Sequence, residues 1–217
     1  MVSLPPFTHS GDLPPGVHAA SLREVLDRFG TGAILRKAVA LRLERIYDMA
    51  RSTGRVARFV VFGSFVTDKP EPNDVDVFLL MDDAFDASEL AGETRLLFDH
   101  SAAQAHFGAS VFWLRRLACL GGRAGDDRVL AGDARGCPKR DRGGHRGDPM
   151  ITNDQELETT VDRIHRLQEQ VAHLRKVETN PVNYRLAASG FLAEIDRMQL
   201  EVREYLSLHP ADSAASG

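Results

Sequence analysis

Four residues in the first half of the chain have the types and spacing of a metal and phosphate site. Gly63 and Ser64 follow one apolar run, and Asp74 and Asp76 begin the next. Aspartates at positions i and i+2 of a strand project from the same face, so they can share divalent cations. A glycine lets the backbone approach a ligand closely, and a serine in the following turn offers a hydroxyl and an amide to a phosphate. The spacing therefore predicts Mg²⁺ or Mn²⁺ at the two aspartates and phosphate at Gly63 and Ser64.

Predicted strands on either side hold this motif in place. Residues 56 to 62 are β-branched and aromatic and end at a glycine, which is typical of a buried strand. Residues 75 to 80 have the same character and predict a neighbouring strand. Residues 110 to 114, Ser-Val-Phe-Trp-Leu, predict a third.

The motif resembles that of nucleotidyltransferases of the DNA polymerase β type, particularly their minimal bacterial forms. In that family Gly-Ser is followed a short distance later by Asp-x-Asp, and Gly63, Ser64, Asp74 and Asp76 match position by position. The wider stretch, roughly residues 13 to 120, also resembles a bacterial family of this fold. The match in its expected context, at the ends of two predicted strands, is more specific than a lone Asp-x-Asp.

The resemblance implies a particular reaction. A hydroxyl on a protein or RNA acceptor attacks the α-phosphate of a nucleoside triphosphate, and pyrophosphate departs. Two magnesium ions would bridge Asp74 and Asp76, and Ser64 would hold the β- or γ-phosphate.

One position departs from the family pattern, which usually supplies a third carboxylate from the next core strand. Here Ser110 stands where that aspartate is expected. A hydroxyl cannot replace a carboxylate as metal ligand or proton acceptor, and losing such a role commonly costs about 10² to 10⁴ in rate. Three other aspartates are candidate replacements, but each is predicted to be a solvated charge: Asp82, Asp83 and Asp99.

Helices are expected around this sheet. Residues 1 to 19 carry two Pro-Pro pairs and predict an extended arm rather than a regular element. The helices then predicted cover residues 21 to 29, with Ser21 and Glu24 as a capping box, residues 33 to 52, and residues 86 to 106. The second of these is expected to bury Ile34, Leu35, Ala38, Leu41, Ile46 and Met49.

The stretch from 121 to 149 is rich in Gly, Arg and Asp and has almost no apolar periodicity. Such a composition buries too little surface to offset chain entropy, so a flexible linker is predicted. Met150 precedes a capping pattern, as the start of an independent polypeptide would. Two origins remain open: fusion of two genes through a frameshift, or a tether selected for its flexibility.

Residues 150 to 210 predict an antiparallel helical hairpin, followed by a disordered tail over 211 to 217. Thr152 with Gln155, or Asn153 with Glu156, can cap the first helix, and Asn180-Pro181 can begin the second. The second helix carries a coiled-coil-like seam made of Tyr184, Ala188, Phe191, Ile195, Met198, Val202 and Tyr205. Such a seam specifies packing, so the hairpin is expected to bind a protein partner or a second copy.

Composition argues against several other classes of protein. The formal net charge is -4, which gives no global attraction to nucleic acid or to an anionic membrane. The chain has two cysteines, too few for a disulfide scaffold, and no apolar run of the length that a membrane helix needs. A cytoplasmic protein without membrane contact is expected.

These observations predict an α/β (α+β) fold with a nucleotidyltransferase-like domain over residues 1 to 120, a small mixed sheet with flanking helices, and the hairpin as a second module. The first functional hypothesis is nucleotidyl transfer, in a toxin-antitoxin-type two-gene module. The alternative is a degenerate site that holds nucleotide and metal without turnover while the hairpin recruits a partner. A purely structural scaffold is the third.

Overall fold

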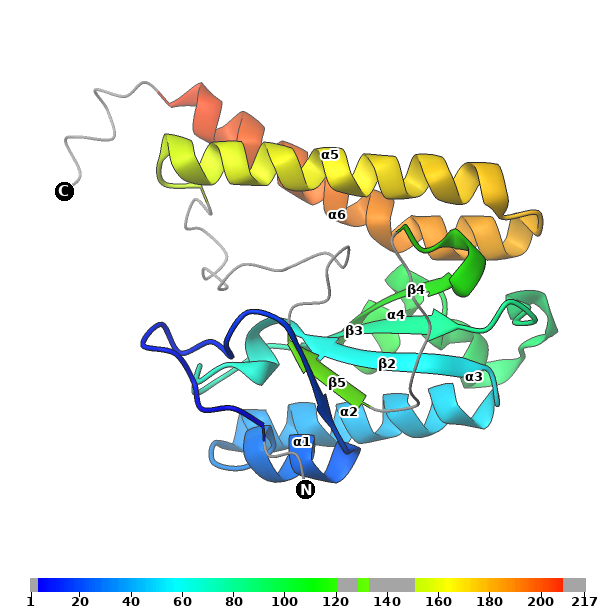
Figure 1. Cartoon of the computed structure of the whole chain (residues 1–217), viewed down its shortest axis with the longest axis horizontal. Helices are drawn as coiled ribbons and strands as arrows, with labels where there is room; N and C mark the ends of the chain where they lie inside the picture. The colour runs from blue at the N-terminus through cyan, green and yellow to red at the C-terminus, as the bar shows by residue number, and fades with distance from the viewer. Residues whose placement is uncertain (1–3, 121–128, 133–150, 209–217) are drawn as a thin grey trace.

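A five-stranded mixed sheet forms the centre of the protein. The computed structural model describes residues 4–120, 129–132 and 151–208. The strand order is β1-β5-β2-β3-β4, with helices on both faces (Figure 1). The strands are β1 (Val17–Ala20), β2 (Val56–Phe62), β3 (Val75–Met81), β4 (Ala109–Arg115) and β5 (Val129–Gly132). The predicted α+β fold, with its mixed sheet, flanking helices and C-terminal hairpin, is confirmed.

The three central strands match the apolar runs that predicted them. β2 and β3 pair antiparallel, and β3 and β4 pair parallel. Every residue of β3 is buried, as expected for a strand covered on both faces. Continuous apolar character, rather than alternation, is therefore what marked these strands in the sequence.

The sheet has two strands that were not predicted. The last residues of the N-terminal arm form β1, and β5 lies within the stretch predicted as a linker. β5 pairs parallel with β2 and antiparallel with β1, so it covers the edge of β2 that a three-stranded sheet would leave open. Each strand has only four residues, too few to show a periodic pattern. The rest of 121–149 and the predicted tail 211–217 lie outside the described residues.

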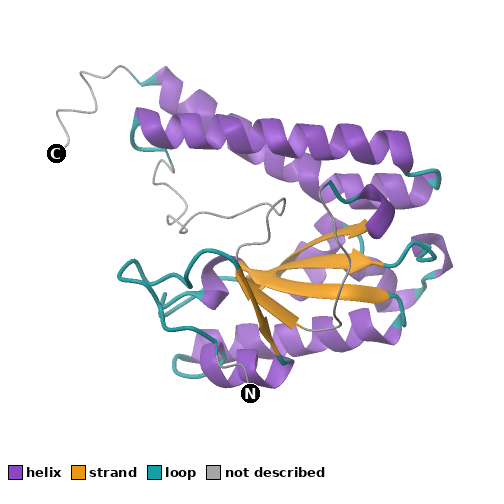
Figure 2. Cartoon of the chain, viewed as in Figure 1, coloured by secondary structure: helices purple, strands orange, loops and turns teal. Residues whose placement is uncertain are grey.

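One face of the sheet is covered by α1 (Leu22–Phe29) and α2 (Ile34–Ser52) (Figures 1 and 2). The predicted capping box is present, with both the Ser21 side chain and the Glu24 side chain bonded to the opposite backbone amide. The buried face predicted for α2 is correct at Ile46 and in part at Met49, which packs against the core, but it is wrong at Ile34 and Leu41, which are exposed. The residues that α2 buries are Arg36, Val39, Ala40, Leu43, Ile46 and Ala50.

The long helix predicted over residues 86 to 106 is divided into three elements: η2 (Ala87–Glu89), α3 (Gly92–Leu97) and α4 (His100–Phe107). Gly92 has a positive φ of 59°, and the Asp99 side chain accepts a hydrogen bond from the Ala102 amide to begin α4. Asp99 is thus a helix cap and not a charge on a helix surface. The break lets Phe98 pack against Phe85 and Trp113, at centroid distances of 4.7 and 5.5 Å.

The C-terminal hairpin consists of α5 (Asp154–Val177) and α6 (Pro181–Ser207). Asn153 caps α5, and Asn180 caps α6 with Pro181 in its first turn, as predicted. The middle of the predicted seam is buried at Ala188, Phe191, Ile195 and Met198. The hairpin lies on the sheet face opposite α1 and α2 (Figure 1).

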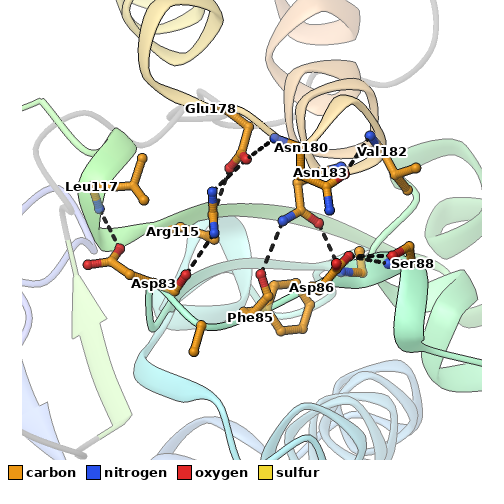
Figure 3. Close-up of polar contacts among 12 residues, drawn as sticks. Asp83, Phe85, Asp86, Ser88, Arg115, Leu117, Glu178, Asn180, Val182 and Asn183 are labelled. Atoms are coloured by element: carbon orange, nitrogen blue, oxygen red, sulfur yellow. Dashed lines mark hydrogen bonds and ion pairs between the residues drawn. The ribbon is translucent and has the colours of Figure 1, made fainter.

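Buried polar contacts attach the hairpin to the rest of the protein (Figure 3). Glu178, between the two helices, accepts two hydrogen bonds from Arg115 at 2.6 and 2.7 Å, and its side chain is 1 % exposed. The same guanidinium donates to the Asp83 carbonyl at 2.7 Å. The hairpin is therefore part of the packed structure, with α6 residues in the same apolar core as the sheet.

No helix within the described ranges combines the length and the apolar character needed to span a membrane.

The Arg115–Glu178 pair generates a stability prediction. Replacing Glu178 with Gln leaves the guanidinium of Arg115, whose side chain is 12 % exposed, without its counter-charge, so we expect the free energy of unfolding to fall by about 3 kcal/mol. Urea denaturation measures the change, with Glu158→Gln on the exposed face of α5 as the control. Equal unfolding midpoints for the two variants would contradict the prediction.

Candidate functional site

The predicted site lies at the end of the sheet where β2 stops and β3 starts. Phe62 of β2 is opposite Asp76 of β3, and Ser110 of β4 is opposite Asp76 on the other side. Opposed residues of neighbouring strands share a face, so one row across the sheet contains Phe62, Asp76 and Ser110. Two residues farther along β4, Phe112 lies 6.0 Å from the ring of Phe191. The Asp76 row is therefore on the face that α6 covers.

Gly63 and Asp76 are in direct contact. Gly63 has a φ of 76°, which side chains other than hydrogen rarely permit. A Cβ added there would lie 1.9 Å from Oδ2 of Asp76, so the carboxylate already occupies that space. The first residue of the predicted phosphate loop and the central predicted metal ligand are thus packed together.

The other two predicted site residues lie beside this contact. Ser64 is partly exposed in η1 (Gly63–Val66), a single 3₁₀ turn after β2. Asp74 is half-buried one residue before β3, whereas Asp76 is only 1 % exposed. All four predicted residues are therefore at one end of the sheet, with one buried and one more accessible carboxylate.

Arg36 of α2 holds the loop that follows Gly63. Arg36 is 7 % exposed, and its guanidinium donates to the Phe65 carbonyl at 2.9 Å and to the Thr67 carbonyl at 2.9 Å. It also donates to the carbonyls of Phe29, at 2.8 Å, and Lys69. Burial lowers the pKa of the Arg36 guanidinium, and the nearby negative charge of Asp68 opposes that shift. The guanidinium of Arg36 thus fixes the path of the loop by hydrogen bonds to its main-chain carbonyls.

Position 110 is where the missing third carboxylate would be. Ser110 is 1 % exposed and in register with Asp76. Its hydroxyl accepts a hydrogen bond of 3.4 Å from Nε2 of Gln104, a residue of α4. The residue opposite the buried aspartate therefore carries a neutral hydroxyl, which is bonded to the carboxamide of Gln104.

None of the three replacement aspartates reaches the site. Asp82 follows the far end of β3 and accepts from the Ala84 amide at 2.9 Å. Asp83 accepts from the Leu117 amide at 2.8 Å, and Asp99 caps α4. Asp82 and Asp83 are about 20 Å from Asp76 along an extended strand. All three have local roles in loops and caps.

The sequence prediction missed Arg36 and Gln104. Arg36 had a detectable signal, because it falls on the 3.6-residue stripe that contains Val39, Leu43 and Ile46, where a charge is out of place. Gln104 had no detectable signal in the sequence, since a glutamine on an exposed helix face is common.

Asp74 and Asp76 offer two carboxylates to a magnesium or manganese ion, which is only part of a coordination shell. Within the described ranges, no group of three or more His, Cys, Asp or Glu side chains is gathered closely enough to hold a metal ion. Mg²⁺, however, is often bound by one or two carboxylates, with water and substrate phosphates completing the shell. Asp74 and Asp76 match that pattern and would hold the ion together with a phosphorylated substrate.

Comparison with known proteins identifies the family. Residues 5–122 match the model of the Family of unknown function (DUF6932). The chain belongs to this family. The family domain, residues 5–122, contains all four predicted site residues together with Arg36, Gln104 and Ser110. The hairpin lies beyond it. No curated protein and no solved structure matches the chain significantly.

The contact between Gly63 and Asp76 can be tested by a double-mutant cycle. Gly63→Ala should destabilise the protein by roughly 2 kcal/mol or more, because it adds a clash with the carboxylate to the strain of a positive φ. Gly54→Ala is the matched control, since Gly54 has a φ of 66° and an added Cβ there meets nothing within 4 Å.

We expect Asp76→Ala to remove the excess cost of Gly63→Ala over Gly54→Ala, leaving only the strain that both glycines share. Urea denaturation of the single and double variants gives the coupling. Strict additivity of the two substitutions would show that the contact does not exist in solution.

Proposed function

We propose that the protein is a metal-dependent nucleotidyltransferase that moves a nucleoside monophosphate from a nucleoside triphosphate to a protein or RNA hydroxyl. The observation that carries this proposal is the contact between Gly63 and the Asp76 carboxylate, with Asp74 two residues earlier. It supports a site in which the phosphate loop and the metal-binding carboxylates act on one triphosphate. The resemblance to the DNA polymerase β type of nucleotidyltransferase supports the same reaction.

In the proposed reaction the acceptor oxygen forms a bond to the α-phosphorus, the bond from that phosphorus to the bridging oxygen breaks, and pyrophosphate leaves. Ser64 and the loop after Gly63 would orient the phosphates. Asp74 and Asp76 would hold Mg²⁺, which when bound neutralises charge on the phosphates. Arg36 would keep the loop in a fixed shape before substrate arrives, through its bonds to the carbonyls of Phe65 and Thr67.

A second candidate function is nucleotide and metal binding without turnover. The buried Ser110 hydroxyl beside Asp76 favours it, because the site then lacks the carboxylate that would accept the proton of the attacking hydroxyl. In the enzymatic alternative that proton passes to solvent water, and turnover is slow. Both functions are compatible with a cytoplasmic location, since nucleoside triphosphates are abundant there, and with a toxin-antitoxin-type two-gene module.

Incubation with each labelled nucleoside triphosphate, Mg²⁺ and a cell extract separates the two candidates. Label that becomes covalently attached to protein or RNA supports transfer. Saturable retention of intact triphosphate without a labelled product supports binding alone. Absence of both transfer and retention would exclude both functions.

Metal binding gives the first prediction of the proposal. Mg²⁺ or Mn²⁺ at ten times its dissociation constant should stabilise the protein by about 1.4 kcal/mol, a rise in melting temperature of roughly 4 °C. The cause is relief of repulsion between the carboxylates of Asp74 and Asp76.

Replacing both aspartates with Asn should abolish the metal-induced shift in a thermal melt. The matched control replaces two exposed acids of α2, Glu44→Gln with Asp48→Asn, and should keep the shift. The same shift in both double variants would place the metal elsewhere.

The missing carboxylate gives the second prediction. Ser110→Asp should leave nucleotidyl transfer unchanged or increase it, by up to about 10²-fold if the new group accepts the proton. Gln104 Nε2, which now donates to Ser110, is positioned to donate to the new carboxylate. The control Ser110→Asn introduces a side chain of nearly the same shape as aspartate but without its charge, and it should not increase nucleotidyl transfer.

Initial rates of label transfer measure the effect. Transfer by the unmodified protein at about 1 per second or faster would show that another group already performs the role assigned to a residue at position 110.

A further inference from the structure

Three buried polar side chains of the hairpin bond to the family domain. Gln170 of α5 donates to the Ala118 carbonyl at 2.7 Å and accepts from the Leu120 amide at 3.2 Å. Glu178 binds Arg115 through both carboxylate oxygens. Asn183 of α6, which is fully buried, accepts from the Ala87 amide at 2.8 Å and donates to the Phe85 carbonyl at 3.1 Å (Figure 3).

Gln170 and Asn183 each bond to a backbone amide and a backbone carbonyl of the family domain. Ala118 is in η3 (Arg116–Ala118), after β4, and Ala87 begins η2, after β3. The carbonyl of Ala118 and the amide of Ala87 bond to the hairpin and not to a neighbouring strand. A buried backbone amide or carbonyl without a hydrogen bond costs about 1 to 3 kcal/mol of stability. This face of the family domain therefore needs water, or a partner with donors and acceptors opposite Ala87 and Ala118.

Between the polar contacts the surfaces approach closely. The ring of Phe112 on β4 packs against Phe191, and Gly190 of α6 lies over the same ring. A Cβ on Gly190 would lie 2.9 Å from Phe112 and 3.1 Å from Nδ1 of His100, so only glycine permits this approach. An apolar centre with specific polar contacts around it is the anatomy of a protein–protein interface.

We propose that the face of the family domain formed by η2, β4 and η3 is a docking surface for a two-helix protein, and that the hairpin of this chain is such a partner joined to it covalently. The family match ends at residue 122, whereas the hairpin is described from residue 151 onward. The partner is defined by its chemistry: an antiparallel helical pair with a glycine over Phe112, a carboxylate for Arg115, and carboxamides for the main chain near Ala87 and Ala118. The proposal does not depend on nucleotidyl transfer.

The docked helices cover the sheet face that carries Asp76. Phe112, which α6 contacts, is on β4 two residues from Ser110, the neighbour of Asp76. A partner at this surface therefore lies against the strand that borders the candidate site. Docking would restrict the acceptors that can approach this side of the sheet.

Cleavage of the intact chain tests the proposal. A site-specific protease sequence is inserted between Gly147 and Asp148, the full-length protein is purified, and the chain is cut without denaturant. We expect the two fragments to remain a 1:1 complex in size-exclusion chromatography at low micromolar concentration, without metal or nucleotide. Separation of the fragments at tens of micromolar would overturn the proposal.

Two variants examine the assigned contacts in the cleaved protein. Asn183→Asp places a carboxylate against the Phe85 carbonyl and should weaken association at least about tenfold, whereas Gln199→Glu, the same amide-to-acid change on the exposed face of α6, should not. Gly190→Ala raises helix propensity yet should also weaken association, so its effect cannot come from loss of the helix. Association equal to the unmodified protein in both Asn183→Asp and Gly190→Ala would overturn the assigned interface.

Discussion

The candidate site depends on a close contact between the carboxylate of Asp76 on β3 and Gly63, the first residue of η1 after β2. Oδ2 of Asp76 fills the space where a Cβ of residue 63 would be. This contact needs β2 and β3 in one register, because a shift by one residue would turn Asp76 to the opposite face. Because β2 and β3 are buried along almost their whole length, such a shift would also disturb the packing on both faces of the sheet. The candidate site thus depends on the sheet core, and the core tolerates a buried acid at its end.

The two faces of the sheet have different roles. One face is covered by α1 and α2, and Arg36 of α2 bonds to the carbonyls of the loop after Gly63. α6 covers the other, on which Asp76 and Ser110 lie in one row. The contacts that shape the loop are therefore on one side of the sheet, and the row of Asp76 and Ser110 is on the other side, where α6 packs.

Sequence patterns predicted those parts of the fold that local chemistry determines. The runs of β2, β3 and β4, the Ser21 and Glu24 capping box, and the Asn180-Pro181 helix start each have a short-range physical cause, and the structure contains them all. The four site residues could be placed together because their strands were predictable. Tertiary contacts decided the rest: β5 forms only by pairing with β1 and β2, and the break before α4 depends on packing Phe98 against Trp113.

The bonds of Arg36 have a consequence for how the loop can change. All four of its acceptors are main-chain carbonyls, and every residue has one whatever its side chain. The guanidinium therefore fixes the course of the loop without specifying the side chain of Lys69. Thr67 differs, because its hydroxyl donates to the Ser64 carbonyl at 2.8 Å and accepts from the Lys69 amide at 3.2 Å. The side chain at position 69 can be exchanged, altering the charge and shape of the loop surface, while the backbone keeps its path. Backbone geometry and side-chain chemistry are therefore separable at this position of the loop.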